Sequence, residues 1–132
     1  MTDYDLIELA KQASENSYSP YSKFKVGAAL LCRDGTVFLG CNVENVSFGA
    51  TNCAERTAIF SAIINGHREF SKIAVVGMSD GKIKDFTPPC GICRQVLKEF
   101  CGSDFSIILF DGKNTKSFTL VEMLPYSFSE FK

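Results

Sequence analysis

The chain has 132 residues, of which 45% are hydrophobic and 22% are charged, and its formal net charge is -1. This length suits one domain over residues 1–132, with a core that needs no disulfide support. The near-neutral charge gives no general attraction to a polyanion, so nucleic acid is not an expected partner. No apolar stretch approaches the ~18 residues needed to cross a bilayer, so no membrane segment is expected.

The six cysteines would allow three disulfides, but the N-terminus argues against a secreted protein. Residues 1–4 show no basic segment followed by an apolar run, which a secretory signal requires. Disulfides are rare in the reducing cytosol. We therefore expect free thiols and a cytoplasmic protein.

The first elements predicted along the chain are a helix and a β-hairpin. Apolar residues recur at helical spacing near residues 3–16, with Thr2 as a plausible N-cap, so an amphipathic helix opens the chain. Two β-rich runs, residues 26–32 and 36–43, flank the Asp-Gly pair at 34–35, which is a two-residue hairpin signal.

The hairpin register follows if Arg33 pairs with Thr36. One strand face then carries Asn42 and Glu44 together. The other face is apolar, and on it free cysteines are expected as packed thiols. Its side chains are Ala28, Leu30, Cys32, Val37, Leu39, Cys41 and Val43.

Helices and strands alternate in the rest of the chain. Asn52 or Thr51 is expected to cap a helix whose first turn holds Cys53 and Glu55. The remaining predicted elements are a buried central strand over residues 73–77, a helix from beside Cys90 to Gly102, a strand over 105–110, a short strand over 117–120 and a last helix over 120–124. This order predicts an α/β sheet with helices packed on its faces, whose strand order the sequence does not show.

Three cysteines and one glutamate form the most informative pattern in the chain. Cys53 is followed two residues later by Glu55, and Cys90 and Cys93 stand in the run Pro-Cys-Gly-Ile-Cys. At a helix start, the last two side chains share a face, with Cβ atoms roughly 5–6 Å apart. Three thiolates bind Zn²⁺ and leave a fourth position for water, while a carboxylate that is not a ligand can move protons beside it. The zinc deaminases share this pattern.

The expected helix starts also favour the thiolate form of these cysteines. A helix N-terminus carries about half a positive charge, which lowers the pKa of a thiol placed there. Three thiolates leave Zn²⁺ with excess negative charge, so a neighbouring cation would keep the ion a good Lewis acid. Arg56 and Arg94 are the candidates, and Arg56 is preferred.

The cysteines allow two other interpretations. A structural zinc needs a fourth protein ligand, but His67 lies roughly 21 Å from Cys53 and Cys101 about 12 Å from Cys93 along their helices. Cys-x-x-Cys at a helix start is also typical of thioredoxin-like dithiols, in which Cys90 and Cys93 would be a redox pair. A redox pair requires neither Cys53 nor Glu55. The full set therefore favours an open, catalytic zinc site over a redox pair or a zinc-stapled binding module.

Five segments of the sequence closely resemble the small, free-nucleoside cytidine deaminases, over nearly the whole chain. They are Pro20 to Leu30, Gly40 to Asn45, Cys53 to Ala58, Pro89 to Val96 and Leu124 to Phe128. The resemblance implies a three-layer α/β/α sandwich with a mixed, roughly five-stranded central sheet. It also implies hydrolytic deamination of cytidine and 2′-deoxycytidine to uridine and 2′-deoxyuridine in pyrimidine salvage, with one Zn²⁺ per chain.

The resemblance also assigns roles to individual residues. Zinc-bound hydroxide would attack C4 while Glu55 shuttles protons to the ring and to the leaving amino group. Asn42 and Glu44 would hold the ribose 3′-hydroxyl, and Phe24 would lie against the pyrimidine ring. Ala54 would present its backbone N–H, which has no intrahelical partner, to the base carbonyl.

A homotetramer with shared active sites is a further implication of the resemblance. Phe128 would then lie near the ligand of another subunit, although a plain core or tail role is the alternative. The sequence departs from the family at Tyr126 and Ser127, where Gly-Ala is common, and at Phe48, where Tyr is common. These differences fall at the intersubunit edge of the expected pocket.

Related deaminases provide the remaining alternatives. Those for deoxycytidylate, guanine or tRNA adenosine usually present His where Cys53 stands, and nucleotide or RNA substrates call for basic contacts. Blasticidin deaminase shares the three-cysteine layout but resembles this chain less at Asn42, Val43 and Glu44. That triplet favours a free nucleoside as the substrate.

Overall fold

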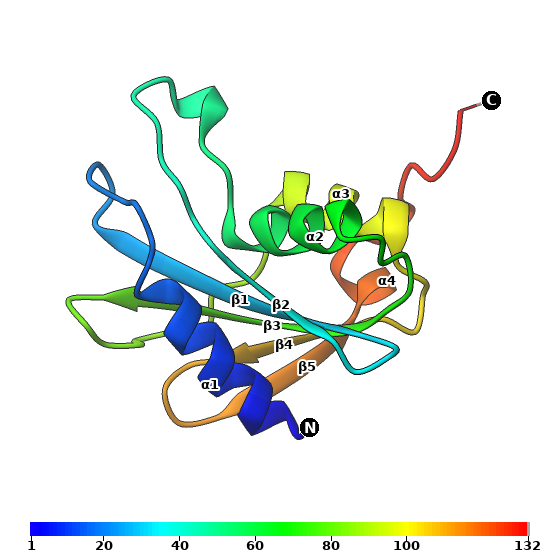
Figure 1. Cartoon of the computed structure of the whole chain (residues 1–132), viewed down its shortest axis with the longest axis horizontal. Coiled ribbons are helices and arrows are strands. Elements are labelled where there is room, and N and C mark those ends of the chain that lie inside the picture. The colour runs from blue at the N-terminus through cyan, green and yellow to red at the C-terminus, as the bar shows by residue number, and fades with distance from the viewer. Residues whose placement is uncertain (132) are drawn as a thin grey trace.

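A five-stranded mixed sheet organises the molecule, and the computed structural model describes it over residues 1–131 (Figure 1). The elements in chain order are α1 (Asp3–Ser14), β1 (Phe24–Cys32), β2 (Val37–Cys41), a 3₁₀ turn η1 (Phe48–Ala50), α2 (Ala54–Ile64), β3 (Phe70–Ser79), α3 (Gly91–Phe100), β4 (Ser106–Phe110), β5 (Thr115–Thr119) and α4 (Leu120–Met123). Within residues 1–131, none of the helices has the length and apolar character needed to cross a membrane.

The strand order is β2-β1-β3-β4-β5. Strands β3 and β4 are parallel, whereas every other neighbouring pair is antiparallel. Figure 1 shows α1 on one face of the sheet and α2, α3 and α4 on the other. The predicted three-layer α/β/α sandwich with a mixed central sheet is therefore confirmed.

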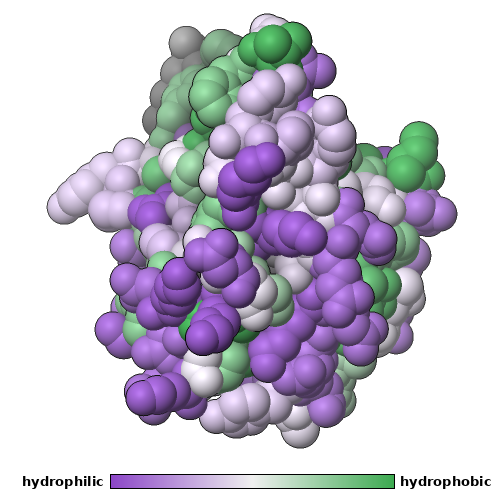
Figure 2. Space-filling model, turned by 90° about the vertical axis from the view of Figure 1, so that its left-hand side faces the viewer, coloured by the Kyte–Doolittle hydropathy of each residue, from purple (hydrophilic) through white to green (hydrophobic). Residues whose placement is uncertain are grey.

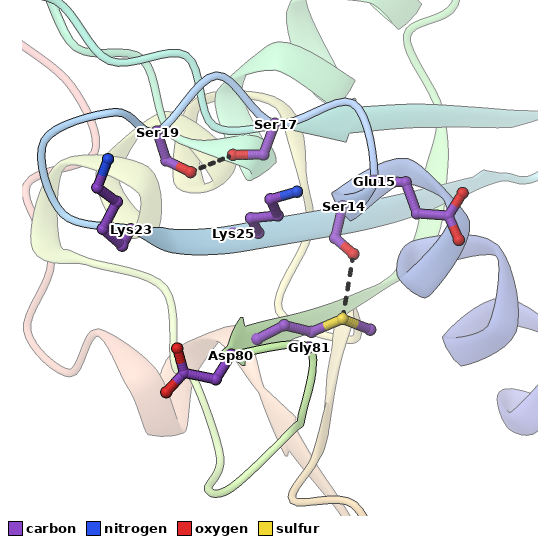
Figure 3. Close-up of a pocket in the computed structure, with 9 residues that line it drawn as sticks. Ser14, Glu15, Ser17, Ser19, Lys23, Lys25, Asp80 and Gly81 are labelled. Atoms are coloured by element: carbon purple, nitrogen blue, oxygen red, sulfur yellow. Dashed lines mark hydrogen bonds between the residues drawn. The ribbon is translucent and has the colours of Figure 1, made fainter.

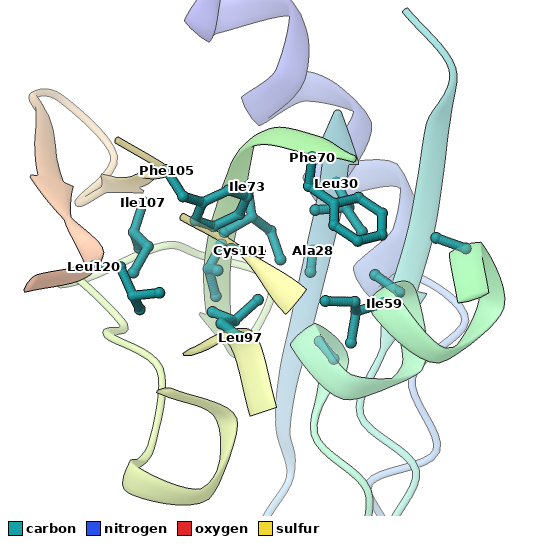
Figure 4. Packing of buried hydrophobic residues seen from close by; sticks show 14 of the residues in the cluster. Ala28, Leu30, Ile59, Phe70, Ile73, Leu97, Cys101, Phe105, Ile107 and Leu120 are labelled. Carbon is teal, nitrogen blue, oxygen red and sulfur yellow. The ribbon is translucent and has the colours of Figure 1, made fainter. Parts of the chain in front are cut away.

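Two apolar clusters hold the layers together, one on each face of the sheet. In the larger cluster, Leu30 and Ile73 from the strands pack with Ile59 of α2 and Leu97 of α3 (Figure 4). The smaller cluster lies under α1. Consecutive residues of β3 alternate between the two, as expected of a central strand covered on both faces. Burying these side chains fixes the faces against which the helices pack.

The helix starts differ in how they are capped. Thr2 caps α1 through a capping box, as predicted, and Thr119 does the same for α4. The prediction that Asn52 or Thr51 caps α2 is wrong, because Cys53 itself occupies the N-cap position. The Asn52 side chain instead donates to Thr57 Oγ1 at 3.1 Å.

The predicted hairpin register is wrong by one residue. Leu30 pairs with Phe38, and the Cys32 N–H donates to the Thr36 carbonyl at 2.8 Å. The loop therefore has three residues rather than two and ends in Gly35, whose φ of +94° suits a glycine. A turn of this kind is built on the same Asp-Gly pair, which is why the sequence signal did not distinguish the two loops.

The corrected register changes which side chains share a face with Ala28. Phe38, rather than Val37 or Leu39, packs against the larger cluster. Gly40 also faces α2, because a Cβ at this position would lie 2.5 Å from the Ala58 nitrogen. Strand β2 therefore allows α2 to approach it closely.

The register also separates two cysteines that were expected to share one apolar face. Cys32 is buried in the larger cluster, whereas Cys41 is half-buried. Gly27, which pairs with Cys41, faces α1, because a Cβ on it would lie 1.9 Å from the Ala10 carbonyl oxygen. Cys41 therefore lies on the α1 side of the sheet, opposite Cys32.

Candidate functional site

Three cysteines from two helix starts converge at one point. Cys53 is the N-cap of α2, Cys90 is the N-cap of α3, and Cys93 lies in the first turn of α3. The sulfur of Cys90 is 3.8 Å from that of Cys53 and 3.5 Å from that of Cys93. No fourth Cys, His, Asp or Glu of residues 1–131 joins this group of potential ligands.

The spacing of the sulfurs fits a single tetrahedral ion. Zinc–sulfur bonds of ~2.3 Å at tetrahedral angles place two sulfurs ~3.8 Å apart. The observed separations of 3.8 and 3.5 Å are close to this value, and the six cysteines are all free. The cluster could therefore hold a metal with little movement of the chain and would leave one coordination position open.

The capping of α2 and α3 is explained by the same cluster. An N-cap side chain usually accepts a hydrogen bond from the first turn, which stabilises a helix by about 1 kcal/mol. Neither Cys53 nor Cys90 makes such a bond. Their sulfurs are thus free to face each other while both helix N-termini point positive charge toward them.

The cluster favours a thiolate at Cys53. A hydrogen bond from Cys93 lowers the pKa of Cys53 to about 5, and further hydrogen bonds from Arg56 and Cys90 act in the same direction against burial. The hydrogen bond to Cys53 raises the pKa of Cys93, because that thiol is the donor. One member of the cluster is therefore prepared to bind a cation near neutral pH.

Of the two arginines expected near the metal, Arg56 contacts a sulfur of the cysteine cluster through its side chain, and the side chain of Arg94 does not. Its Nη2 donates to the Cys53 sulfur at 3.3 Å and to the Thr51 carbonyl at 3.5 Å. Arg94 instead donates to the carbonyls of Pro89 and Met123, each at 2.7 Å. Arg94 thus ties the start of α3 to α4, while Arg56 places positive charge beside the cluster.

Glu55 lies in the first turn of α2 with only 4% of its surface exposed. Burial raises the pKa of its carboxyl group to about 7, and the negative charge of Cys53 adds to the rise. The carboxyl group can therefore take up or release a proton near neutral pH in metal-free protein. Those are the properties required of a proton shuttle.

Asn42 and Glu44 are both buried and lie just beyond the end of β2. Tyr18 holds them in an extended segment, because its N–H donates to the Asn42 carbonyl and its carbonyl accepts from the Glu44 N–H. Side chains two residues apart on such a segment point to the same side. The structure therefore places the two together, as expected.

The polar contacts of this pair leave part of its capacity unused. Glu44 accepts from the backbone N–H groups of Tyr21 and Ser22 and from the Ser22 hydroxyl. The Asn42 amide nitrogen donates to the Phe24 carbonyl at 2.8 Å. One amide hydrogen and one lone pair on the carboxylate are left, which is a donor and an acceptor for one hydroxyl group.

Sequence reasoning missed the residues that position this pair. Ser22 contacts Glu44 through its hydroxyl, and the Ser17 hydroxyl donates to the Asn42 side-chain oxygen. The clustering of serines in residues 17–22 was the only available signal, and it is as typical of an ordinary loop.

The remaining predicted residues lie at different depths. Phe24 is half-buried and its ring covers Gly77 of β3, since a Cβ there would lie 2.3 Å from Phe24 Cζ. Ala54 is buried as the first residue of α2. Phe128 is 60% exposed, which excludes a core role within this chain, and its carbonyl accepts from Gln95 Nε2 at 2.7 Å.

A cavity of about 700 Å³ lies apart from the cysteines (Figure 3). Its lining mixes Lys23 and Lys25 with Glu15 and Asp80, and the buried Ser14 hydroxyl contacts the Met78 sulfur. No group of potential metal ligands within residues 1–131 includes a residue of this lining. The cysteine cluster is therefore the better candidate for chemistry.

Replacing Arg56 by Gln should raise the pKa of the Cys53 thiol in metal-free protein, because a hydrogen bond and a positive charge that lower it are lost. A thiol is alkylated as the thiolate. The pH at which Cys53 alkylation is half-maximal should therefore move upward, as followed by iodoacetamide labelling and peptide mass spectrometry. Arg94→Gln is the matched control and should leave the midpoint pH of Cys53 alkylation unchanged. Equal midpoints in wild type and Arg56→Gln would contradict the role given to Arg56.

Comparison with known proteins agrees with this geometry. Residues 1–109 match the family model described as the cytidine and deoxycytidylate deaminase zinc-binding region. The chain is 47% identical to a cytidine deaminase of Sporosarcina psychrophila over 126 residues, which are 95% of this chain and 90% of that protein. It is 30% identical to a blasticidin-S deaminase of Bacillus cereus, over 96% of this chain and 92% of that one.

A solved structure gives the same result for the fold. The crystal structure of cytidine deaminase from Burkholderia pseudomallei superposes with a TM-score of 0.90 at 48% identity, covering 97% of this chain and all of that one. Sequence and structure thus agree over most of the length of both proteins. The chain belongs to the cytidine deaminase family.

Proposed function

We propose that this protein hydrolyses cytidine and 2′-deoxycytidine to uridine and 2′-deoxyuridine with release of ammonia, and that residues 1–132 act as one catalytic domain. The observation that carries the proposal is the convergence of three cysteine sulfurs beside a buried glutamate. That donor set leaves one coordination position for water and supplies a base next to it.

The metal proposed for the cluster is one Zn²⁺ per chain, held by Cys53, Cys90 and Cys93. Thiolates at tetrahedral spacing suit zinc better than magnesium or calcium, which prefer oxygen ligands. When bound, zinc would supply a Lewis acid that lowers the pKa of a coordinated water toward neutrality. Arg56 offsets part of the negative charge of the thiolates through its contact with Cys53.

Glu55 acts as the proton carrier of the reaction. Its carboxylate accepts a proton from the attacking water and delivers it to ring N3, which makes C4 more electrophilic. The water oxygen bonds to C4, and the proton left on that hydroxyl passes through the same carboxyl group to the amino group. The C4–N bond then breaks to release ammonia, and C4 keeps the oxygen as a carbonyl. In metal-free protein the pKa of this carboxyl group is about 7, a value that suits proton transfer in both directions.

The rest of the site orients the nucleoside. The free donor of Asn42 and the free acceptor of Glu44 suit the ribose 3′-hydroxyl, and the Ala54 N–H suits the base carbonyl. Phe24 lies across Gly77 and would offer its ring to the pyrimidine. These contacts favour a small neutral nucleoside over nucleic acid, as does the net charge of -1.

A dithiol redox role for Cys90 and Cys93 is less well supported. Their sulfurs are 3.5 Å apart, but the Cys53 sulfur lies almost as close to Cys90, at 3.8 Å. A third thiol at that distance, with Arg56 donating to it, serves no purpose in a two-cysteine exchange. It is what a three-thiolate metal centre requires.

We further propose a cytoplasmic homotetramer in which subunits share their active sites. Large apolar side chains are exposed at several places: Val46, Phe48, Ile92, Phe128 and Phe131. Figure 2 shows a mostly hydrophilic end face with hydrophobic residues toward the top and along the right-hand edge. Exposed large apolar side chains are found more often at protein interfaces than elsewhere on the surface. The six free cysteines suit a reducing compartment.

Glu55→Gln should retain the bound zinc and lose about 10²- to 10⁴-fold in kcat, because general acid/base transfer is removed while the thiolates remain. Zinc content by mass spectrometry and ammonia release from cytidine measure the two quantities. Glu99→Gln, at an exposed position of α3, is the matched control. A fully metallated Glu55→Gln enzyme with wild-type turnover would remove Glu55 from this role.

Glu44→Gln should weaken recognition of the ribose 3′-hydroxyl. A hydrogen bond to a charged group contributes about 1.5–3 kcal/mol, so kcat/KM for cytidine should fall about 10- to 150-fold. With 2′,3′-dideoxycytidine, which lacks that hydroxyl, wild type and variant should differ little. An equal loss on both substrates would mean that Glu44 supports the loop of residues 21–22 and does not read the sugar.

Shared active sites predict that two impaired variants complement each other. Glu55→Gln subunits mixed and reassembled with Phe128→Ala subunits should form some sites with Glu55 from one chain and Phe128 from another. Activity should then exceed the mean of the two parents, and sedimentation velocity should show a tetramer. Strict averaging on mixing would place Phe128 in its own subunit's site, and a monomer would refute the assembly.

A further inference from the structure

A second group of potential metal ligands lies at the far end of α2. It consists of Cys32 at the end of β1, Asp34 in the hairpin loop and His67 just after α2, whose ligand atoms all lie within 4.8 Å of one another. Helix α2 has 11 residues, which separates this group from Cys53 by ~16 Å. The group is therefore distinct from the proposed catalytic centre.

The spacing within the group suits a tetrahedral ion. His67 Nε2 lies 3.2 Å from Asp34 Oδ2. Zinc bonds of ~2.0–2.1 Å to nitrogen and oxygen at tetrahedral angles place those two atoms ~3.3 Å apart. One thiol, one imidazole and one carboxylate are a zinc-type donor set, whereas magnesium and calcium avoid sulfur.

A tight helix ending holds His67 in place. Asn65 is the C-cap of α2, and Gly66 follows it with a φ of +90°. The Gly66 N–H donates to the Ile63 carbonyl at 3.0 Å, and the His67 N–H donates to the Ala62 carbonyl at 3.0 Å. This is a Schellman ending, in which the two residues after the cap are fixed by backbone hydrogen bonds.

The hairpin loop fixes the other two side chains. The Gly35 N–H donates to the Cys32 carbonyl at 3.0 Å, and the Thr36 N–H donates to Asp34 Oδ1 at 2.9 Å, which directs Oδ2 toward His67. The Arg33 N–H also donates to the Glu69 carbonyl at 3.0 Å and joins the loop to the segment after α2. All three donors thus stand on backbone that is already ordered.

The two arginines near the group make their contacts with other partners. Arg33 pairs with Asp104 at 3.1 Å, and Arg68 donates to the carbonyls of Ile63 and His67. The contact with Asp34 is the only polar contact of the His67 ring within residues 1–131. That contact is made by Nε2, which is the ring nitrogen that would bind the ion, while the buried Nδ1 has no hydrogen-bond partner within residues 1–131.

Access to the group differs for an ion and for a substrate. A hollow of about 510 Å³ is lined by Asp34, His67 and Glu69, together with Gly66 and the two arginines Arg33 and Arg68. An ion with its waters can reach the imidazole and the carboxylate from this hollow. Cys32 is only 2% exposed, which leaves no room for a substrate carbonyl at its sulfur. A Cys-His-Asp triad for nucleophilic attack is thereby excluded, whereas a bare ion needs far less space.

We propose that Cys32, Asp34 and His67 form a second, peripheral site for Zn²⁺ or a divalent ion of similar chemistry, with water completing its coordination. Binding there would clamp the β1–β2 hairpin to the end of α2, because the donors come from both segments. With one thiolate instead of three, the site should bind more weakly than the cysteine cluster.

The test is a titration with Co²⁺ and with Zn²⁺ against a chromophoric chelator, starting from the purified protein as isolated. Wild type should take up one further, weaker equivalent, and with Co²⁺ this equivalent should add a sulfur-to-metal charge-transfer band. His67→Gln and Cys32→Ser should each weaken that step by at least about tenfold. The quantity compared between variant and wild type is the affinity of the weaker binding step. The comparison therefore holds whether or not the cluster at Cys53 already contains metal.

Cys101→Ser is the matched control, because Cys101 is a buried thiol outside both groups. It should leave the weaker step unchanged, and cytidine turnover should be unchanged in all three variants. His67→Gln, at a partly exposed position, keeps the test valid if Cys32→Ser is unstable. The proposal is overturned if wild type takes up no further equivalent, if the step survives in His67→Gln, or if Cys101→Ser also abolishes it.

Discussion

The site depends on one constraint, which is that α2 and α3 must begin at the same place. Their N-cap residues, Cys53 and Cys90, hold their sulfurs 3.8 Å apart. Gly40 allows α2 to lie close to β2, and Arg94 ties the start of α3 to α4. The packing of the larger cluster then brings two segments that are remote in the chain together as one set of potential metal ligands.

The starts of α2 and α3 lack the N-cap hydrogen bonds that stabilise the other two α-helices. Helices α1 and α4 start with threonine capping boxes, whereas α2 and α3 start with cysteines that cap nothing. A cap is worth about 1 kcal/mol, and burying Glu55 adds a further cost because its charged form is desolvated. Violations of local rules gathered in one place are typical of functional sites. Here they leave the thiolates and the carboxyl group available for a metal and a proton.

The predictions that succeeded used information within single elements. The helix over residues 3–16, the buried strand around residue 75 and the two helix starts near Cys53 and Cys90 follow from periodicity and from turn residues. The hairpin register failed because an Asp-Gly pair serves loops of two and of three residues. The hydrogen bonds from the loop of residues 17–22 to Asn42 and Glu44 could not be predicted, because they depend on how the folded chain places that loop beside the end of β2.

The error in the hairpin register did not affect the prediction that Asn42 and Glu44 lie together, and the reason is physical. Asn42 and Glu44 are two residues apart on one extended segment, so they share a side whichever residue pairs with them. Cys32 and His67 lie on different segments. Their proximity depends on the three-residue loop and on the Schellman ending of α2. The distance along α2 separates His67 from Cys53, but only the folded loop and helix ending bring His67 to Cys32, so periodicity within single elements could not predict the second group.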